Sequence, residues 1–237
     1  MTRPLVLIPS YNPGPHLART LRDALAQGHP VWVVSDGSTD GSDAVVEPLG
    51  ARLLRLPRNR GKGAAVQHGL REAAAEHYTH ALVMDADGQH PAACIRPFIA
   101  ASAAHPAAMV LGRPVFGPEA PRLRMAGHRL SNLATRHLAG APGIADSLFG
   151  FRVYPIAPLL AVMAATRHMR GFDFDPEAAI RLARAGVPAL NLPAPVLYRS
   201  RRQGGVSHFR YARDNLRLAW MYARLALAPR PSSAARP

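Results

Sequence analysis

"VMDADGQH" (residues 83–90) ends an apolar segment with two aspartates in three residues, and a glycine, an amide and an imidazole follow. Alternate side chains of an extended backbone point to the same side, so Asp85 and Asp87 would bring two like charges together. That arrangement is costly unless a cation or a shared proton compensates it. The plainer interpretation is a strand followed by a polar turn, with Gln89 capping a helix that starts at Pro91. These eight residues alone do not distinguish a cation site from a turn, so the rest of the sequence is needed to choose between them.

Four apolar runs in the first half of the chain have the length and composition of buried strands. They are "LVLI" (5–8), "VWVV" (31–34), "RLLRL" (52–56) and "ALVM" (81–84). The segments between them have helical spacing, at 16–28, 41–49 and 63–77. Strands that alternate with helices at this interval predict an α/β domain with an open, mostly parallel sheet flanked by helices.

Polar motifs follow all four predicted strands: "PSYNPG", "SDGSTDGS", "PRNRGKG" and "DADGQH". The carboxyl ends of parallel strands meet at one edge of the sheet, where open α/β domains bind their ligands. Asp36 at that edge can hydrogen-bond a base or a ribose, and Lys62 lies between glycines at a helix N-terminus that favours an anion. Asp85 and Asp87 can hold a hard divalent ion through oxygen ligands. Together these groups predict a site for a nucleoside diphosphate and a metal ion.

The second half of the chain is less regular, and it contains no internal repeat and no clean linker. Its predicted elements are an apolar run at 108–112, helical segments at 122–140, 156–167 and 175–185, and an extended stretch at 187–198. The expected organisation is one domain over 1–212, a C-terminal amphipathic helix over 213–228 and a disordered tail over 229–237.

The formal net charge is +14 at pH 7, and almost all the positive charge comes from arginine because Lys62 is the only lysine. Such a charge favours anionic partners: phosphates, nucleotides, acidic lipid headgroups or nucleic acid. A basic nucleic-acid-binding protein without catalysis is therefore the alternative class. Only 6% of the residues are aromatic and no recognised nucleic-acid motif is present, so we do not expect a nucleic-acid partner.

The single cysteine, Cys94, cannot form an internal disulfide, which fits a reducing compartment. No segment approaches the ~20 apolar residues that span a bilayer. We expect a cytoplasmic protein that is either free or peripheral at the inner face of the membrane.

The last predicted helix, 213–228, has two interpretations. Contact with an anionic membrane surface is expected if its apolar residues insert beside its arginines, namely Trp220, Met221 and Leu225 beside Arg213, Arg217 and Arg224. The helix can instead dock on the domain through an apolar stripe made of Leu216, Trp220 and Leu227 with Met221.

Five motifs, "IPSYNPG", "VVSDGSTDGS", "NRGKGAA", "MDADGQH" and "DSLFGFRVY", resemble in order and spacing those of family 2 glycosyltransferases with the GT-A fold. The resemblance spans residues 4–210 and is strongest with the dolichyl- and polyprenyl-phosphate sugar transferases, whose pattern includes an Asp-x-Asp-x-Gln metal motif. It implies a Rossmann-like GT-A sheet and an inverting, metal-dependent transfer of a sugar from a UDP- or GDP-sugar.

The resemblance also implies roles on the nucleotide side of the site. Pro9, Tyr11 and Asp36 would contact the nucleoside, with Lys62 near the nucleotide. The chain departs from the pattern at Pro13, where the family usually has Glu after Tyr-Asn.

Two further segments would act on the diphosphate. Asp85, Asp87 and Gln89 would surround Mg²⁺ or Mn²⁺. The basic stretch 199–215 resembles the loop that closes over the donor diphosphate, which makes Arg202 and His208 candidate catalytic residues beside Asp87.

The segment "GFDFDPEAAIRLARAG" (171–186) resembles the acceptor-side helix, with Asp175 or Asp173 in the place of an acidic group that contacts the acceptor. A hydroxyl acceptor, soluble or lipid, would need Asp175 as a general base, whereas a polyprenyl phosphate is already an anion. The arginine excess and the C-terminal helix favour the lipid phosphate. Alternatively, Asp175 only caps a helix that begins at Pro176.

Overall fold

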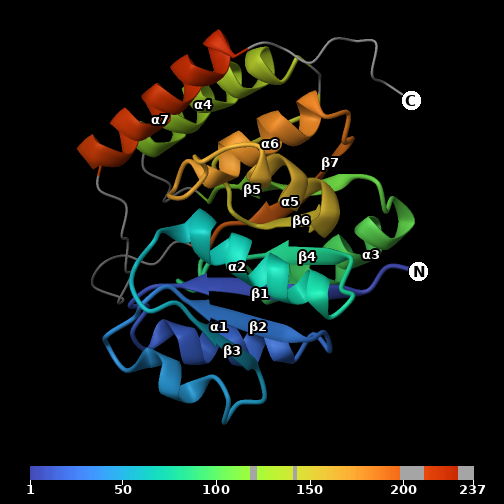
Figure 1. The fold of residues 1–237 in the computed structure, drawn as a ribbon, viewed down its shortest axis with the longest axis vertical. Coiled ribbons are helices and arrows are strands. Elements are labelled where there is room, and N and C mark those ends of the chain that lie inside the picture. The colour runs from blue at the N-terminus through green and yellow to red at the C-terminus, as the bar shows by residue number, and fades with distance from the viewer. Residues whose placement is uncertain (118–121, 141–142, 198–210, 229–237) are drawn as a thin grey trace.

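The computed structural model describes residues 1–117, 122–140, 143–197 and 211–228, and Figure 1 shows their fold. One seven-stranded sheet forms within these residues. Its strands are β1 (Pro4–Ser10), β2 (Val31–Ser35), β3 (Arg52–Arg55), β4 (His80–Val83), β5 (Met109–Val115), β6 (Arg152–Pro155) and β7 (Ala189–Pro195). The α-helices are α1 (His16–Leu25), α2 (Lys62–Ala75), α3 (Ile95–Ala104), α4 (Arg122–Ala139), α5 (Ile156–Ala164), α6 (Phe174–Arg184) and α7 (Tyr211–Leu227), and the 3-10 helices are η1 (Ser42–Val45) and η2 (Ala92–Cys94).

The strands are arranged in the order β3-β2-β1-β4-β6-β5-β7. Neighbours from β3 to β4 are parallel, and so are β5 and β7, but β6 runs antiparallel to both β4 and β5. The predicted α/β fold with a mostly parallel sheet is confirmed. The helix expected over 41–49 is wrong: only η1 forms there, because Pro48 has no N–H with which to continue a helix.

Side-chain alternation along the strands builds two cores, one on each face of the sheet. In β1, Leu5 and Leu7 pack in the core beneath α2, whereas Val6 and Ile8 pack against α1 and α3. Helices α2, α5 and α6 thus cover one face of the sheet, and α1 and α3 cover the other (Figure 1). The crossover loops at the carboxyl ends of the parallel strands therefore all open at the same edge.

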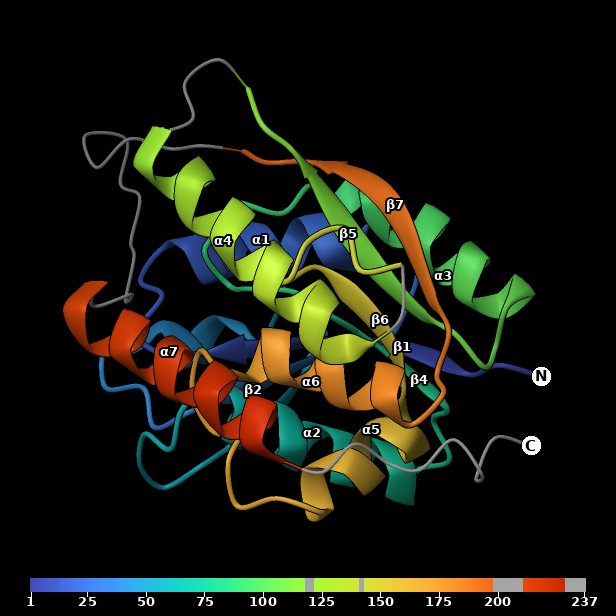
Figure 2. The ribbon, with the colours of Figure 1, turned by 90° about the horizontal axis from the view of Figure 1, so that it is seen from above.

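Helices α4 and α7 lie outside this three-layer sandwich, beside α6 (Figure 2). An apolar cluster joins the three helices through Leu138 of α4, Ile180 of α6, and Leu218, Met221 and Leu225 of α7. An ion pair adds to this contact, since Nη2 of Arg224 lies 2.6 Å from Oε2 of the wholly buried Glu177. Helix α7 is therefore docked on the domain.

The sequence predicted that three apolar residues of α7 face a membrane, and this prediction is wrong for two of them. Met221 and Leu225 are buried in the contact with the domain, because they lie on the side of the helix that faces α6 and α4. Trp220 keeps 65% of its surface exposed, in a stripe with Leu216 and Leu227. None of the described helices combines the length and apolar character needed to span a bilayer. The tail over 229–237 lies outside the described residues.

Gly69 offers a test of how closely α2 packs on the sheet. A Cβ at this position would lie 2.6 Å from Cδ1 of Leu7 and 2.8 Å from Cγ2 of Val34. Gly69→Ala should therefore lower the free energy of unfolding by about 1–3 kcal/mol, although alanine has the higher helix propensity. Gly127→Ala in α4 is the matched control, because a Cβ there meets nothing within 4 Å. Urea unfolding should show this control unchanged or stabilised by up to about 1 kcal/mol; equal effects of the two changes would contradict the packing.

Candidate functional site

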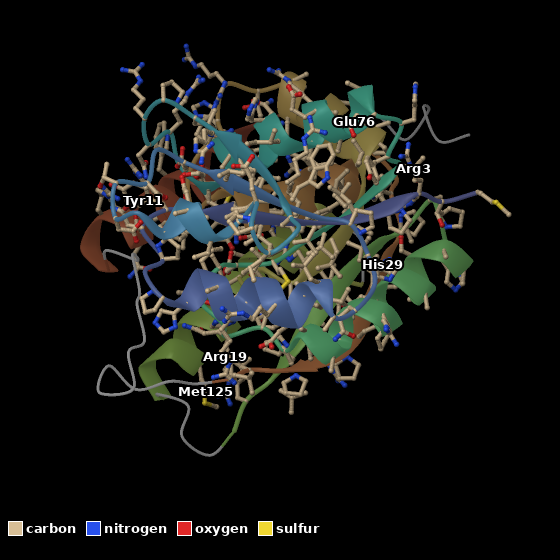
Figure 3. All side chains as sticks on the ribbon, turned by 90° about the horizontal axis from the view of Figure 1, so that it is seen from below. Arg3, Tyr11, Arg19, His29, Glu76 and Met125 are labelled. Carbon is tan, nitrogen blue, oxygen red and sulfur yellow. The ribbon has the colours of Figure 1, made fainter. Side chains whose placement is uncertain are left out.

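A cavity of about 1010 Å³ opens at the carboxyl edge of the sheet. Figure 3 marks this edge by Tyr11, just past β1, at the opposite end of the molecule from Arg3, which precedes the strand. The site residues expected from the sequence that line the cavity are Pro9, Tyr11, Asp36, Lys62, Asp85, Asp87, Gln89 and Asp175. The fold thus brings together residues from five separate segments of the chain.

Lys62 lies between two carboxylates at the centre of this cavity. Its ammonium group is 2.7 Å from Oδ1 of Asp85 and 2.7 Å from Oδ2 of Asp175. Burial acts to lower the pKa of Lys62, but the charges of Asp175 and Asp85 outweigh burial and hold the pKa above its ordinary value. Lys62 is therefore a permanent cation that neutralises part of an acidic cluster.

The start of α2 is held in place by glycines that allow close backbone contact. Gly61 has φ +97°, and a Cβ on it would lie 2.3 Å from the carbonyl oxygen of Arg170. A Cβ on Gly63 would lie 1.9 Å from the carbonyl oxygen of Met169. The glycines of "GKG" thus bring Lys62 against the segment that leads into α6 and carries Asp175.

Asp85 and Asp87 follow β4 and differ in their electrostatic surroundings. Burial raises the pKa of Asp87, and the negative charge of Asp85 raises it further. Burial also acts on Asp85, but the positive charge of Lys62 outweighs it, so the pKa of Asp85 lies below its ordinary value. Oδ1 of Asp87 accepts the backbone N–H of Gln89 at 2.9 Å. The sequence predicted an unfavourable repulsion between the two carboxylates, and in the structure this repulsion raises the pKa of Asp87 and not that of Asp85.

A divalent cation fits this donor set. Carboxylate and amide oxygens are available from Asp85, Asp87 and Gln89, all at the cavity wall. Within the described ranges no group of three or more His, Cys, Asp and Glu side chains could hold a metal alone. Mg²⁺ is commonly bound by one or two carboxylates together with phosphate oxygens of a substrate, so two carboxylates suffice.

Asp36 joins two of the loops around the cavity. Its carboxylate oxygens accept the backbone N–H groups of Arg60 at 2.8 Å and Gly61 at 2.7 Å. Burial raises the pKa of Asp36, although these two hydrogen bonds oppose the shift. The loop after β1 is joined in turn, because Oδ1 of Asn12 accepts the N–H of Thr39 at 2.7 Å. Sequence reasoning did not identify this role for Asn12.

Asp175 lies in the first turn of α6, so the alternative interpretation, that it only caps this helix, is wrong. The helix begins at Phe174, with Asp173 in the N-cap position. Asp173 does not line the cavity; its Oδ1 accepts the N–H of Gly171 at 2.9 Å. Asp175 is 4% exposed, and its Oδ1 is buried without a hydrogen-bond partner among the described residues. Of the two aspartates, Asp175 is the one placed at the site.

Two residues of "LFGFR" support the cluster without a role assigned from the sequence. Arg152 is wholly buried and donates from Nη1 to the carbonyl oxygen of Asp175 at 2.6 Å. Gly150 makes room for the ion pair, since a Cβ on it would lie 2.6 Å from Nζ of Lys62 and 2.8 Å from Oδ2 of Asp85. A charged residue inside an apolar strand is the sequence signal that could have identified Arg152.

His90 contacts the acidic pair from the segment that follows it. His90 accepts the N–H of Asp85 through Nδ1 at 3.1 Å, and burial lowers the pKa of His90. His90 therefore positions Asp85 as a neutral imidazole. Arg202 and His208 lie outside the described residues, so their roles stay predictions.

Comparison with known proteins identifies the family. Residues 5–173 match the model of glycosyl transferase family 2. The chain is 27% identical over 203 residues to the polyprenol monophosphomannose synthase of Mycolicibacterium smegmatis, covering 81% of this chain and 76% of that protein.

Two solved structures share the fold. M. tuberculosis glucosyl-3-phosphoglycerate synthase has a TM-score of 0.63 at 17% identity, covering 95% of this chain and 78% of that chain. S. aureus TarS 1-349 in complex with UDP-GlcNAc has a TM-score of 0.63 at 17% identity, covering 99% of this chain and 69% of that chain. With the family match over most of its length and a GT-A fold around the acidic cavity, this chain belongs to the family 2 glycosyltransferases.

Proposed function

We propose that this glycosyltransferase moves a sugar from a nucleotide-sugar donor to a polyprenyl phosphate, with inversion at the anomeric carbon and with a divalent cation. The observation that carries the proposal is the cluster in which Lys62 lies 2.7 Å from both Asp85 and Asp175, beside Asp87. This cluster combines a fixed cation with a carboxylate that lacks an ion-pair partner among the described residues. A diphosphate with its metal ion supplies what such a cluster needs.

The donor end of the cavity is formed by the loops after β1, β2 and β3. Tyr11 is 38% exposed beside the cavity, and Asp36 fixes the loop at Arg60 and Gly61. An aromatic ring and a carboxylate are suited to a base and a ribose. A fold neighbour in complex with UDP-GlcNAc supports a nucleotide sugar, with UDP or GDP as the nucleotide.

A bound Mg²⁺ or Mn²⁺ would neutralise charge on the nucleoside diphosphate as it leaves. Asp85, Asp87 and Gln89 would hold the ion, and Lys62 keeps Asp85 ionised for that purpose. Arg202 and His208 are proposed to add positive charge over the same diphosphate. The acceptor then attacks the anomeric carbon from the face opposite to the diphosphate, which gives inversion.

The acceptor assignment has two supports. A relative at 27% identity is a polyprenol monophosphomannose synthase, and helix α7 presents an apolar stripe outward. Leu216 and Trp220 in this stripe are 72% and 65% exposed, next to Arg213 and Arg217. Apolar and basic side chains on one helix suit an anionic membrane surface, where a lipid acceptor resides, so we propose peripheral binding at the inner face. Transfer to a hydroxyl acceptor is the alternative.

Loss of the acidic pair should abolish most transfer. Asp87→Asn replaces a carboxylate by a poor ligand for a divalent ion, so the rate should fall roughly 10²–10³-fold. A chelator should have the same effect on the wild type, measured as sugar transfer from a labelled nucleotide sugar. Asp23→Asn, on the exposed side of α1, is the control and should keep the full rate. Full activity of the wild type in the chelator would contradict metal dependence.

Gly150 tests the position of Lys62. In Gly150→Ala the new methyl group would collide with Nζ of Lys62 and move it from Asp85, so kcat should fall roughly 10²-fold. Gly117→Ala should have no effect, since a Cβ there meets nothing within 4 Å. Steady-state kinetics of both variants are the measurement. An unchanged kcat in Gly150→Ala would show that the rate does not depend on this ion pair.

The two sides of α7 should respond differently to a polar substitution. Trp220→Ser should weaken sedimentation with anionic liposomes about tenfold and leave the melting temperature unchanged, because Trp220 is exposed. Met221→Ser should lower the melting temperature, because Met221 is 1% exposed and packs on the domain. If Trp220→Ser binds liposomes as the wild type does, α7 is not the membrane contact.

A further inference from the structure

Helix α4 carries a histidine that forms a buried pair with a carboxylate at the cavity wall. Nδ1 of His128 lies 2.8 Å from Oδ2 of Asp146. Their side chains are only 10% and 4% exposed. His128 also lines the cavity that contains Lys62 and Asp85. The roles described above use neither member of this pair.

Asp146 is held as a carboxylate by several hydrogen bonds. Its Oδ2 also accepts from Asn132 at 3.1 Å, and its Oδ1 accepts the N–H groups of Leu148 at 2.9 Å and Phe149 at 2.8 Å. Burial acts to raise the pKa of Asp146, but the hydrogen bonds from His128, Asn132 and Phe149 help to outweigh burial, so the pKa lies below its ordinary value. An ionised carboxylate only accepts, so the proton between the two groups belongs to Nδ1 of His128.

The other ring nitrogen of His128, Nε2, is therefore the reactive end. It has no hydrogen-bond partner within the part of the chain that the structure describes. The ring is fixed from one side by Phe116, whose centroid is 5.3 Å away in an edge-to-face arrangement. A carboxylate that fixes one nitrogen of an imidazole leaves a lone pair on the other, as in the Ser-His-Asp triad.

The position of the pair relative to the sheet places it opposite the donor loops. The nucleoside loops follow β1, β2 and β3, on one side of Asp85 at the end of β4. Phe116 follows β5, and the segment from Asp146 to Gly150 precedes β6, on the other side. A Cβ on Gly150 would lie 2.6 Å from Nζ of Lys62 and 2.8 Å from Oδ2 of Asp85, so this segment runs from the pair to the centre of the cavity. His128 thus lies across Asp85 from the nucleoside loops, on the side where an attacking acceptor would bind.

We propose that His128 is a catalytic residue whose Nε2 binds the reacting group of the acceptor and takes up its proton. This inference rests on the proposed function of the cavity. For a hydroxyl acceptor, the O–H proton moves to Nε2 while the oxygen bonds to the anomeric carbon, whose bond to the nucleoside diphosphate breaks. For a phosphate acceptor, one proton is held between Nε2 and a phosphate oxygen, while an unprotonated oxygen of the same phosphate bonds to the anomeric carbon and the bond from that carbon to the nucleoside diphosphate breaks.

Asp175, the base expected from the sequence, is less available for this task. Its Oδ2 is occupied by Lys62 at 2.7 Å. Its backbone carbonyl accepts a hydrogen bond from Arg152 at 2.6 Å, so both the side chain and the backbone of Asp175 are held in place. His128 lines the cavity, its Nε2 has no hydrogen-bond partner among the described residues, and Asp146 holds its Nδ1.

The variant His128→Gln tests the proposal, because glutamine can still donate to Asp146 but lacks a nitrogen that accepts a proton. Transfer is measured with a short polyprenyl phosphate and with the matching polyprenol. With the phosphate, the acceptor KM should rise roughly 10–100-fold with little change in kcat, as for loss of a hydrogen bond to a charged group. With the alcohol, kcat should fall roughly 10²–10⁴-fold with little change in KM.

Two controls separate this role from a structural one. His137→Gln, on the exposed side of the same helix, should behave as the wild type. His128→Ala should regain activity when imidazole is added to the assay, while its affinity for the nucleoside diphosphate stays that of the wild type.

The possible results distinguish a failure of the role of His128 from a failure of the proposed function. If the wild type is active and His128→Gln changes neither KM nor kcat by more than about twofold, the role of His128 is wrong and the proposed function stands. If the wild type uses the alcohol but not the phosphate, the proposed acceptor is wrong, and a large loss of kcat in His128→Gln still supports His128. A wild type that uses neither acceptor contradicts both.

Discussion

The site depends on one ammonium group held between two carboxylates. Lys62 begins α2, Asp85 follows β4 and Asp175 lies in the first turn of α6, so this interaction joins elements that are far apart in the sequence. Moving like charges together at a sheet edge is unfavourable, and Lys62 offsets the cost for Asp85 but leaves it on Asp87. That remaining imbalance is the observation from which we propose a cation bound together with an anionic ligand. The close glycine contacts at the start of α2 exist to keep Lys62 in this position.

Local pattern was enough to predict the N-terminal strands and the residues that follow them, because buried parallel strands are continuous apolar runs with polar ends. The direction of β6 could not be predicted, since "FRVY" has the same apolar pattern in either orientation. The pairing of Lys62 with Asp175 spans 113 residues and leaves no local signal. The same reason applies to His128 and Asp146. It applies also to the docked side of α7, where Met221 is buried and its neighbour Trp220 is exposed.

The order of strands separates the two sides of the cavity. In the proposed function, the loops after β1, β2 and β3 form the donor end, the residues after β4 supply the acidic pair, and the segments around β5 and β6 form the acceptor end with α4 and α7. The same layer of helices that closes the acceptor end also carries the exposed apolar stripe of α7. A lipid-linked acceptor could therefore reach His128 and the donor while its chain stays at a membrane surface.

The central claim, that the acidic pair holds a cation only together with a diphosphate, is tested most directly by electron paramagnetic resonance of Mn²⁺. Free Mn²⁺ is titrated into the protein with and without UDP or GDP. The account predicts that the wild type with one of these nucleotides lowers the free signal well below the level reached with the nucleotide alone, and that this additional fall is lost in the Asp85→Ala, Asp87→Ala double variant. Equal loss of free Mn²⁺ in the wild type and the double variant, at matched nucleotide concentration, would contradict it.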